Sequence, residues 1–239
     1  MSITEKLLTI AENEQNVYNA GYEKGKSEGG GGDVVDHTMY ATTLAFGDLN
    51  LFGKPKVVIR CNALKGIGGL FNATVLNTTV EELEVFCEKT ITSIESIAPA
   101  YLAKSENALK RLILHTDTSQ CTSFNSFLWK QANIEEIGGT PLDFTSMTHT
   151  NLWLSGCSNL REIRVKENTI YKSISFSNSA VWSDESKQSI FDGLATVETA
   201  ETLTLTKNVK ILQSQVDSAN NKGWTVAGGK VVSEEEYYA

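Results

Sequence analysis

Residues 80–85 read Val-Glu-Glu-Leu-Glu-Val, and the spacing of their aliphatic side chains returns three more times along the chain. Each copy follows the pattern aliphatic-x-x-aliphatic-x-aliphatic, with glycine in the last position of one copy. The copies are Val80-Leu83-Val85, Leu109-Leu112-Leu114, Ile134-Ile137-Gly139 and Leu160-Ile163-Val165. Successive copies lie 29, 25 and 26 residues apart. A period in this range is typical of a stacked solenoid, in which each turn contributes one short strand.

Each repeat has an inner and an outer set of side chains. Because side chains alternate along a strand, we expect the second and third aliphatic residues of each copy to face the core. The rest of each repeat returns along the far side with its own apolar residues, and residues 173–176 read as a fifth strand. The apolar residues of the return segments are Ile91, Ile94, Ile97, Phe124, Phe127, Leu128, Leu152 and Leu154. The sequence therefore predicts repeats over residues 80–179.

The N-terminal residues 1–28 have the pattern of an amphipathic helix. Ser2 and Glu5 form a capping box, and an apolar stripe follows at helical spacing. The residues proposed to make the contact are Ile3, Leu7, Ile10, Val17 and Tyr18. A lone helix of this length is marginal in water. We therefore expect it to pack on a copy of itself or on a partner, with packing onto its own domain as the alternative.

Four glycines at residues 29–32 predict a flexible hinge after this helix. Residues 33–79 contain two stretches that read as strands, at 42–46 and 56–60, with turn residues between them. We expect this region to cap the N-terminal end of the solenoid, because an uncapped end exposes its core.

Residues 180–239 differ from the repeats and predict a C-terminal cap made of helices and strands. Ser183 is expected to cap one helix, and Asn208 a second helix that Gly223 ends. Strands are predicted at 202–206 and 224–227, the second of them being the last strand of the chain. The acidic tail, residues 234–239, is expected to be loose or used in docking.

Charge and hydropathy exclude several classes of partner. The formal net charge is -8 and the sequence pI is about 5.0, which argues against nucleic acid as a partner because phosphates attract a basic face. No apolar stretch is long enough for membrane insertion. The first residues lack the basic and apolar regions of a secretory signal. We therefore expect a protein that is made in a cytoplasm and stays there, or that is exported inside a larger assembly.

Motifs for chemistry are mostly missing from the sequence. The four cysteines, Cys61, Cys87, Cys121 and Cys157, form no close pair and are expected to be reduced core residues, with no metal or cofactor site. Residues 21–27 resemble a phosphate-binding loop but have one residue too few between the glycines. A nucleophile pair of Cys121 with His115 or His149 needs a proximity that spacing cannot show. The sequence favours a protein that is not an enzyme.

The outward positions of the repeat strands form the candidate ligand surface. These positions are Glu82, Glu84, Phe86, Arg111, Ile113, His115, Glu136, Thr140, Arg164 and Lys166. One interpretation is structural, since opposite charges on neighbouring strands stabilise a sheet by about 0.2–1 kcal/mol per pair. The other is a binding surface with a partly apolar patch. Two interpretations also apply to three tryptophans, Trp129, Trp153 and Trp182: they either pack in the core or, if exposed, stack on sugars.

A resemblance to a known family rests on the repeat motif and the two ends of the chain. Residues 155–163, Ser-Gly-Cys-Ser-Asn-Leu-Arg-Glu-Ile, resemble the turn-and-strand signature of BspA-type leucine-rich repeats, and residues 118–127 resemble a looser copy. The opening residues 3–21 and the stretches at 176–186, 203–205 and 223–225 resemble the ends of repeat proteins carried by prophages of Gram-positive bacteria. Residues 33–79 carry no part of this resemblance.

The resemblance implies an α/β fold, an irregular leucine-rich-repeat solenoid with an N-terminal helix and a helix-strand C-terminal cap. It implies a phage structural protein of the tail tip or fibre, located in the virion, whose repeats recognise a glycan or protein on the host surface. The helix would join copies into a homo-oligomer, with a trimer as one candidate, and would contact other virion proteins. A bacterial surface adhesin, a capsid decoration protein and a cell-wall glycan hydrolase are the alternatives.

Overall fold

The structure is a computed structural model that describes residues 34–39, 43–44, 54–61, 66–68, 77–87, 90–95, 107–150, 153–179 and 181–238. In this part the chain is mixed α/β, with parallel strands and few helices. The predicted helix over residues 1–28, with Ile3, Leu7, Ile10, Val17 and Tyr18, lies outside the described residues. The predicted glycine hinge at 29–32 also lies outside them.

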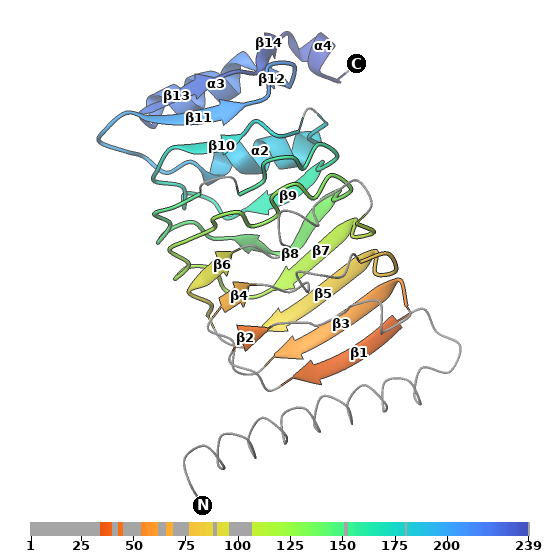
Figure 1. Cartoon of the computed structure of the whole chain (residues 1–239). Coiled ribbons are helices and arrows are strands. Elements are labelled where there is room, and N and C mark those ends of the chain that lie inside the picture. Colours follow the sequence, from red (N-terminus) through yellow and green to blue (C-terminus); the bar gives the residue numbers. More distant parts are fainter. Residues whose placement is uncertain are drawn as a thin grey trace, which may run out of the picture.

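A six-stranded parallel sheet, called the long sheet below, runs through most of the molecule (Figure 1). Its strands, in spatial order, are β1 (Val34–Met39), β3 (Lys56–Cys61), β5 (Glu82–Cys87), β7 (Arg111–His115), β8 (Glu136–Leu142) and β9 (Glu162–Val165). The predicted repeats are register partners in it, since Leu112 lies opposite both Leu83 and Ile137, and Ile137 lies opposite Ile163. The predicted repeat spacing is therefore confirmed as strand pairing.

The core lies behind the long sheet and contains the predicted inward residues. Leu83, Leu112 and Leu114 have no exposed surface, and Ile163 is 1% exposed. Behind them runs a short sheet of β2 (Thr43–Leu44), β4 (Gly66–Gly68) and β6 (Ser93–Glu95). Single parallel bridges extend this second wall from Ser93 to Ser123 and on to His149. Burial of apolar side chains between the two walls is the main source of stability.

A line of aromatic rings fills the wider part of the core. Trp153 makes edge-on contacts with Phe144 and Phe176, at centroid distances of 5.5 and 5.1 Å, and Phe176 continues to Trp182 at 6.0 Å. The Trp153 indole also donates to the Ser175 carbonyl at 2.8 Å. Trp153 and Trp182 are therefore core residues and do not form an exposed surface for stacking on sugars. Trp129 is half-buried, with the Lys130 ammonium 5.0 Å from its ring centroid.

Buried amide side chains form a ladder that sequence reasoning missed. Asn77 donates to Asn107 at 3.1 Å, and Asn107 donates to Gln131 at 2.8 Å, all three being at most 4% exposed. Asn77 Oδ1 also accepts from the Val80 amide, so the ladder fixes the turn before the strand. Its signal was in the sequence, as a polar residue two or three positions before the first aliphatic residue of successive repeats.

The long sheet begins earlier than the first predicted repeat at residue 80. Strands β1 and β3 pair in register with β5, and Val57 and Ile59 are fully buried like the inward residues of the later strands. The sequence analysis found β3 but not β1, whose residues Val34–Met39 include polar positions and lack the repeat pattern. Residues 34–61 thus contribute two strands to the same sheet.

At the C-terminal end of the long sheet, helix α2 (Asp184–Gly193) lies where a further strand would pair. Ser183 caps it as predicted, its hydroxyl accepting from the Ser186 amide. Ser186 Oγ accepts from the Ile163 amide and Ser189 Oγ accepts from the Val165 amide, so side chains satisfy the open edge of β9. An unpaired edge would otherwise leave these donors exposed or buried without partners.

The remaining elements form two small parallel sheets with helices beside them. One sheet contains β10 (Ile174–Phe176), β11 (Glu201–Leu205) and β13 (Trp224–Ala227), and the other contains β12 (Lys210–Leu212) and β14 (Lys230–Val232). Helices α3 (Gln213–Asn221) and α4 (Glu234–Tyr238) complete this end. The predicted strands at 173–176, 202–206 and 224–227 are present, but β13 is not the last strand, because β14 follows it.

One prediction for this end was wrong, and one of the two alternatives given for the tail is excluded. Asn208 does not cap the second helix, because residues 210–212 pair as β12 and α3 starts after Leu212. The acidic tail is not loose: α4 packs down through Tyr237, which is 7% exposed and lies 4.0 Å under the buried Lys187 ammonium. Lys230 also pairs with Glu236 at 2.6 Å. The partner of Tyr237, Lys187, was too far away in sequence to be recognised.

Candidate functional site

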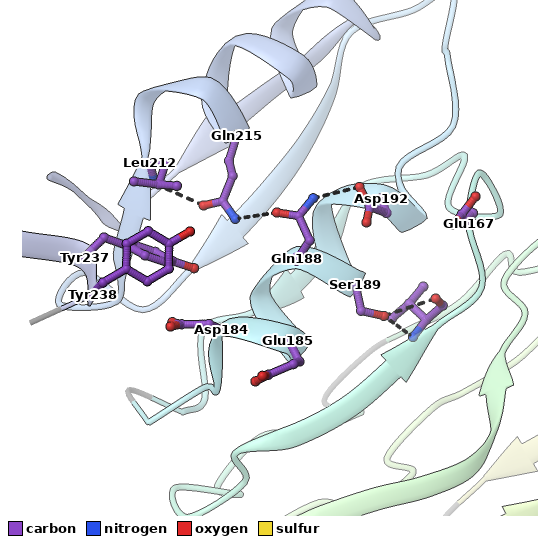
Figure 2. A pocket seen from close by; sticks show the side chains of 11 residues that line it. Glu167, Asp184, Glu185, Gln188, Ser189, Asp192, Leu212, Gln215, Tyr237 and Tyr238 are labelled. Carbon is purple, nitrogen blue, oxygen red and sulfur yellow. Dashed lines mark hydrogen bonds between the residues drawn. The ribbon is translucent and has the colours of Figure 1, made fainter. Parts of the chain in front are cut away.

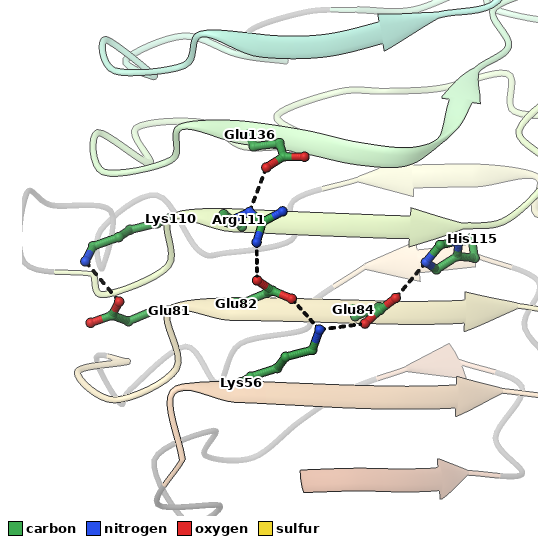
Figure 3. Close-up of polar contacts among 8 residues, drawn as sticks. All are labelled: Lys56, Glu81, Glu82, Glu84, Lys110, Arg111, His115 and Glu136. Carbon is green, nitrogen blue, oxygen red and sulfur yellow. Dashed lines mark hydrogen bonds and ion pairs between the residues drawn. The ribbon is translucent and has the colours of Figure 1, made fainter. Parts of the chain in front are cut away.

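The outward face of the long sheet carries a continuous network of ion pairs across four strands, β3, β5, β7 and β8 (Figure 3). Arg111 bridges Glu136 at 2.6 Å and Glu82 at 2.5 Å. Lys56 bridges Glu82 at 2.6 Å and Glu84 at 3.0 Å, and Glu84 reaches the His115 ring at 2.8 Å. The candidate residues on β5, β7 and β8 are therefore brought together, joined by Lys56, which the sequence analysis did not select.

The network sets the ionisation of its members. The hydrogen bonds to Glu82 and Glu84 raise the pKa of Lys56. Burial pushes the pKa of Glu84 upward, but the hydrogen bonds from Lys56 and His115 outweigh it and hold that pKa below its ordinary value. The hydrogen bond to Glu136 is the main cause of a raised pKa at Arg111. Glu84 is thus charged and paired at neutral pH.

A shallow groove of about 380 Å³ lies in this face. Its lining includes Ile113, Gly138 and Gly139, together with the network residues and Arg164. Ile113 is only 9% exposed, so the prediction that it forms an exposed apolar patch was wrong. It lies between Glu84 on β5 and Gly138 on β8, and its side chain packs over Gly138. What remains outward is the Phe86–His115 pair.

Phe86 and His115 form a stacked pair on neighbouring strands. Their ring centroids are 4.1 Å apart with planes 12° from parallel, and the Arg60 guanidinium lies 4.4 Å from the Phe86 centroid. The order Arg60, Phe86, His115 follows the register of β3, β5 and β7. A cation over an aromatic face is a favourable arrangement, so this row is built from planar groups packed face to face.

A bulge in β8 interrupts the row after His115. Ile137 pairs with Ile163 and Leu142 with Val165, so β8 uses more residues than β9 between these two rungs. Gly139 takes a φ of +92°, and a Cβ there would lie 2.3 Å from the Leu114 carbonyl oxygen, so only glycine fits. This explains the glycine in place of a repeat aliphatic. It also moves Thr140 out of the predicted row and onto the bulge.

A second hollow of about 430 Å³ continues from the groove past the bulge. It is lined by the ends of β5, β7, β8 and the residue after β9, with His115 shared between the two hollows. Thr140 and Lys166 lie here, and Lys166 pairs with Asp143 at 2.9 Å. Burial pushes the pKa of Asp143 upward, but its hydrogen bonds to Thr145 and Lys166 hold that pKa below its ordinary value.

A third hollow of about 490 Å³ lies between α2, α3 and α4 (Figure 2). Its side chains bond mainly to one another: Gln188 contacts Asp192 at 2.8 Å and Gln215 at 3.1 Å, and Gln215 accepts from the Leu212 amide. Ser189, which lines the same hollow, accepts a hydrogen bond from the Val165 amide of β9. We therefore interpret this hollow as a structural seam between the helices and the last strands.

The cysteines are buried free thiols where the structure describes them. Burial raises the pKa of Cys87 to about 11 and those of Cys121 and Cys157 to about 12. Cys121 donates to the Ile91 carbonyl and Cys157 to the Leu128 carbonyl, at 3.2 and 2.9 Å. A thiol of such high pKa supplies almost no thiolate at neutral pH, which disfavours the pairing of Cys121 with a histidine as a nucleophile.

Searches of the described residues for other kinds of site give two negative findings. No cluster of three or more His, Cys, Asp or Glu side chains in that part could hold a metal ion. No helix in that part is long and apolar enough to cross a bilayer.

Comparison with known proteins adds no family: no protein-family model, no curated protein and no solved structure matches this chain. The resemblance to leucine-rich repeats therefore rests on the residues quoted above.

Proposed function

We propose that this chain is a non-enzymatic binding protein, an irregular leucine-rich-repeat solenoid that presents the outward face of its long sheet to a ligand. The observation that carries the proposal is the in-register stack of parallel strands with an open, polar, grooved face. Strands offset by 25 to 29 residues that pair with their nearest repeat are what a solenoid requires. Such a stack offers a broad surface and not a deep cleft.

The setting we propose is a phage virion, with the chain part of the tail tip or fibre and its repeats contacting the host envelope. The support is the resemblance of the repeats and both chain ends to prophage repeat proteins. In this proposal residues 1–28 anchor the protein as a homo-oligomer and to other virion proteins, residues 29–32 act as the hinge, and residues 80–179 carry the recognition surface.

The chemistry of the face supports binding over catalysis. Its carboxylates Glu82, Glu84 and Glu136 are each held by a cation. A general acid or base needs an unusual pKa near neutrality, whereas the pKa of Glu84 is lowered. The groove is shallow, so it would not exclude water from a reacting bond.

Binding to intact cells tests the proposal. Fluorescent full-length protein is incubated with a panel of Gram-positive cells, and bound protein is counted by flow cytometry. We expect binding to at least one strain, a loss of at least about tenfold for the charge reversal Arg164→Glu on the face, and no loss for Lys207→Glu, an exposed lysine between β11 and β12. Equal binding by both variants would count against the face as the binding surface.

Mass measurement in solution tests the anchor. Light scattering of the full chain is expected to give a homo-oligomer, and the chain without residues 1–28 a monomer. The same mass for both proteins would remove the anchoring role. Release of sugars or peptides from purified cell walls would instead favour a hydrolase.

A further inference from the structure

The row of planar groups on the face ends at His115 with one ring surface uncovered by a partner strand. Phe86 covers one side of the His115 ring. The other side looks toward β8, where the pairing stops at Leu114 opposite Gly139, so no residue of β8 pairs with His115. Figure 3 shows the end of β8 bending away from β7 beyond this point. The row Arg60, Phe86, His115 therefore has no next member on β8, and this vacant position is called the missing rung below.

Beside this missing rung β8 carries two glycines, because neither position has room for a side chain. The side chains of Ile113 and Glu136 already lie over Gly138, 2.7 and 2.6 Å from where a Cβ would be, and a Cβ on Gly139 would meet the Leu114 carbonyl oxygen. Both hollows on the face reach His115, one from the glycine side and one from the Thr140 side. A flat group the size of a single ring can thus lie against His115, where the two hollows meet.

The charge on the far side of this gap comes from Arg164 on β9. It lines the same groove as His115 and is exposed. It makes no hydrogen bond or ion pair with any residue that the structure describes, unlike Arg111 and Lys56 on the same face. Arginine binds carboxylates through two parallel hydrogen bonds, so the unpaired guanidinium favours a carboxylate on the ligand.

We propose that the missing rung binds one pyranose ring carrying a carboxylate, as in an acidic polysaccharide. The apolar face of the sugar stacks on His115, whose aromatic face attracts its C–H groups, and the carboxylate binds Arg164. The groove is open along the sheet, so the polysaccharide chain can continue in both directions from the bound ring. This inference rests on the proposed function and names the ligand class of the same face.

Titration with two matched trisaccharides tests the ligand class. The full chain is titrated with a galacturonate trisaccharide and with the neutral galactose trisaccharide of the same linkage, while the ring protons of His115 are followed by NMR. We expect the acidic sugar to shift the His115 signals and to bind at least about tenfold more tightly, because a charge-assisted bidentate contact is lost with the neutral one. Equal affinities, or no shift with the acidic sugar, would overturn the inference.

Variants locate the contact and separate the two proposals. Arg164→Gln, an exposed position that should not affect folding, is expected to lower affinity for the acidic trisaccharide about tenfold, and Lys207→Gln to leave it unchanged. The acidic trisaccharide is then used as a competitor in the cell-binding assay. If cells bind but neither the competitor nor Arg164→Gln has an effect, the ligand inference falls and surface recognition stands. If the trisaccharide binds at His115 but no cells do, the ligand inference stands and the proposed function falls.

Discussion

In the long sheet each strand edge is covered by the next strand, whereas at the C-terminal end the edge of β9 is covered by the side chains of α2. Between β5 and β7, backbone groups pair along five residues in succession. At β9 the hydroxyl groups of only two serines, Ser186 and Ser189, accept hydrogen bonds from the strand's backbone amides. An edge covered by side chains therefore depends on single residues for its hydrogen bonds. An edge covered by a strand has its hydrogen bonds distributed over many residues.

The two regions also differ in whether their polar surface side chains bond to one another. The polar side chains between the helices bond to one another and close the seam, as with Gln188 and Gln215. On the long sheet the ion pairs reach from β3 to β8 and stop, which leaves Arg164 beyond them. We infer that the C-terminal end is built for closure and the long sheet for display.

The largest expected effect is at Trp153, which joins the two regions. Its ring contacts Phe144 of the repeats and Phe176 of β10, and its indole holds the Ser175 carbonyl. Trp153→Ala should lower the free energy of unfolding by about 3–5 kcal/mol through loss of burial and a cavity. Urea denaturation measures it. Tyr171→Ala, at a side chain 43% exposed, is the control and should change stability by at most about 0.5 kcal/mol.

The amide ladder comes next, because its members are buried and depend on one another. Asn107→Ala removes a partner from both Asn77 and Gln131, and should cost about 1–3 kcal/mol for polar groups left unsatisfied. Combining it with Asn77→Ala should cost less than the two single changes together, since they share a bond. Strict additivity in urea denaturation would show that the ladder does not act as a unit.

Closure by α2 can be tested at its two serines. Ser186→Ala or Ser189→Ala leaves the Ile163 or Val165 amide without its acceptor and should cost about 1 kcal/mol. Hydrogen exchange should then become faster at that amide in particular. Ser158→Ala, at an exposed position, is the matched control. Unchanged exchange at both amides would mean that the edge of β9 is protected in another way.

Acid should affect the paired carboxylates of the long-sheet region. The pKa values of Glu84 and Asp143 in the fold lie below their ordinary values of 4.5 and 3.8. Each group therefore stabilises the fold fully above its ordinary pKa, and the contribution is lost as the pH falls through the lower folded value. Asp143→Asn should lower stability by about 1 kcal/mol at pH 7 and make the acid loss less steep. An equally steep loss in the variant, by urea denaturation between pH 2 and pH 7, would contradict this.

Sequence reasoning predicted the part of the fold that rests on local pattern. The aliphatic period of residues 80–165 gave the strands and the register, since a strand side chain must face either the core or water. The pattern for the Ser183 cap was equally local. Sequence reasoning missed β1, whose stretch lacks the repeat pattern. It also missed α4, whose Tyr237 packs under Lys187, a residue far away in the chain.

For the candidate site the sequence supplied the residues but not their arrangement. Alternation placed Glu82, Arg111 and Glu136 on one face, where they do meet. It could not show that Ile113 is covered, that Lys56 joins the network, or that β8 bulges. The glycine at position 139 was visible as a departure from the repeat, but its positive φ, and the gap that this creates beside His115, depend on the Leu114 carbonyl of the neighbouring strand.

The smallest expected effect is at the centre of the ion-pair network. Arg111 is 48% exposed at its side chain although it bridges two carboxylates, and exposed pairs contribute only about 0.2–1 kcal/mol each. Arg111→Met should therefore lower stability by no more than about 1 kcal/mol, and the difference from the unchanged protein should shrink in 1 M salt as screening weakens the pairs. A loss as large as that at Asn107, and insensitive to salt, would show that the face is needed for closure. A small, salt-sensitive loss would mean that the fold tolerates change on this face, as a surface free to evolve for binding requires.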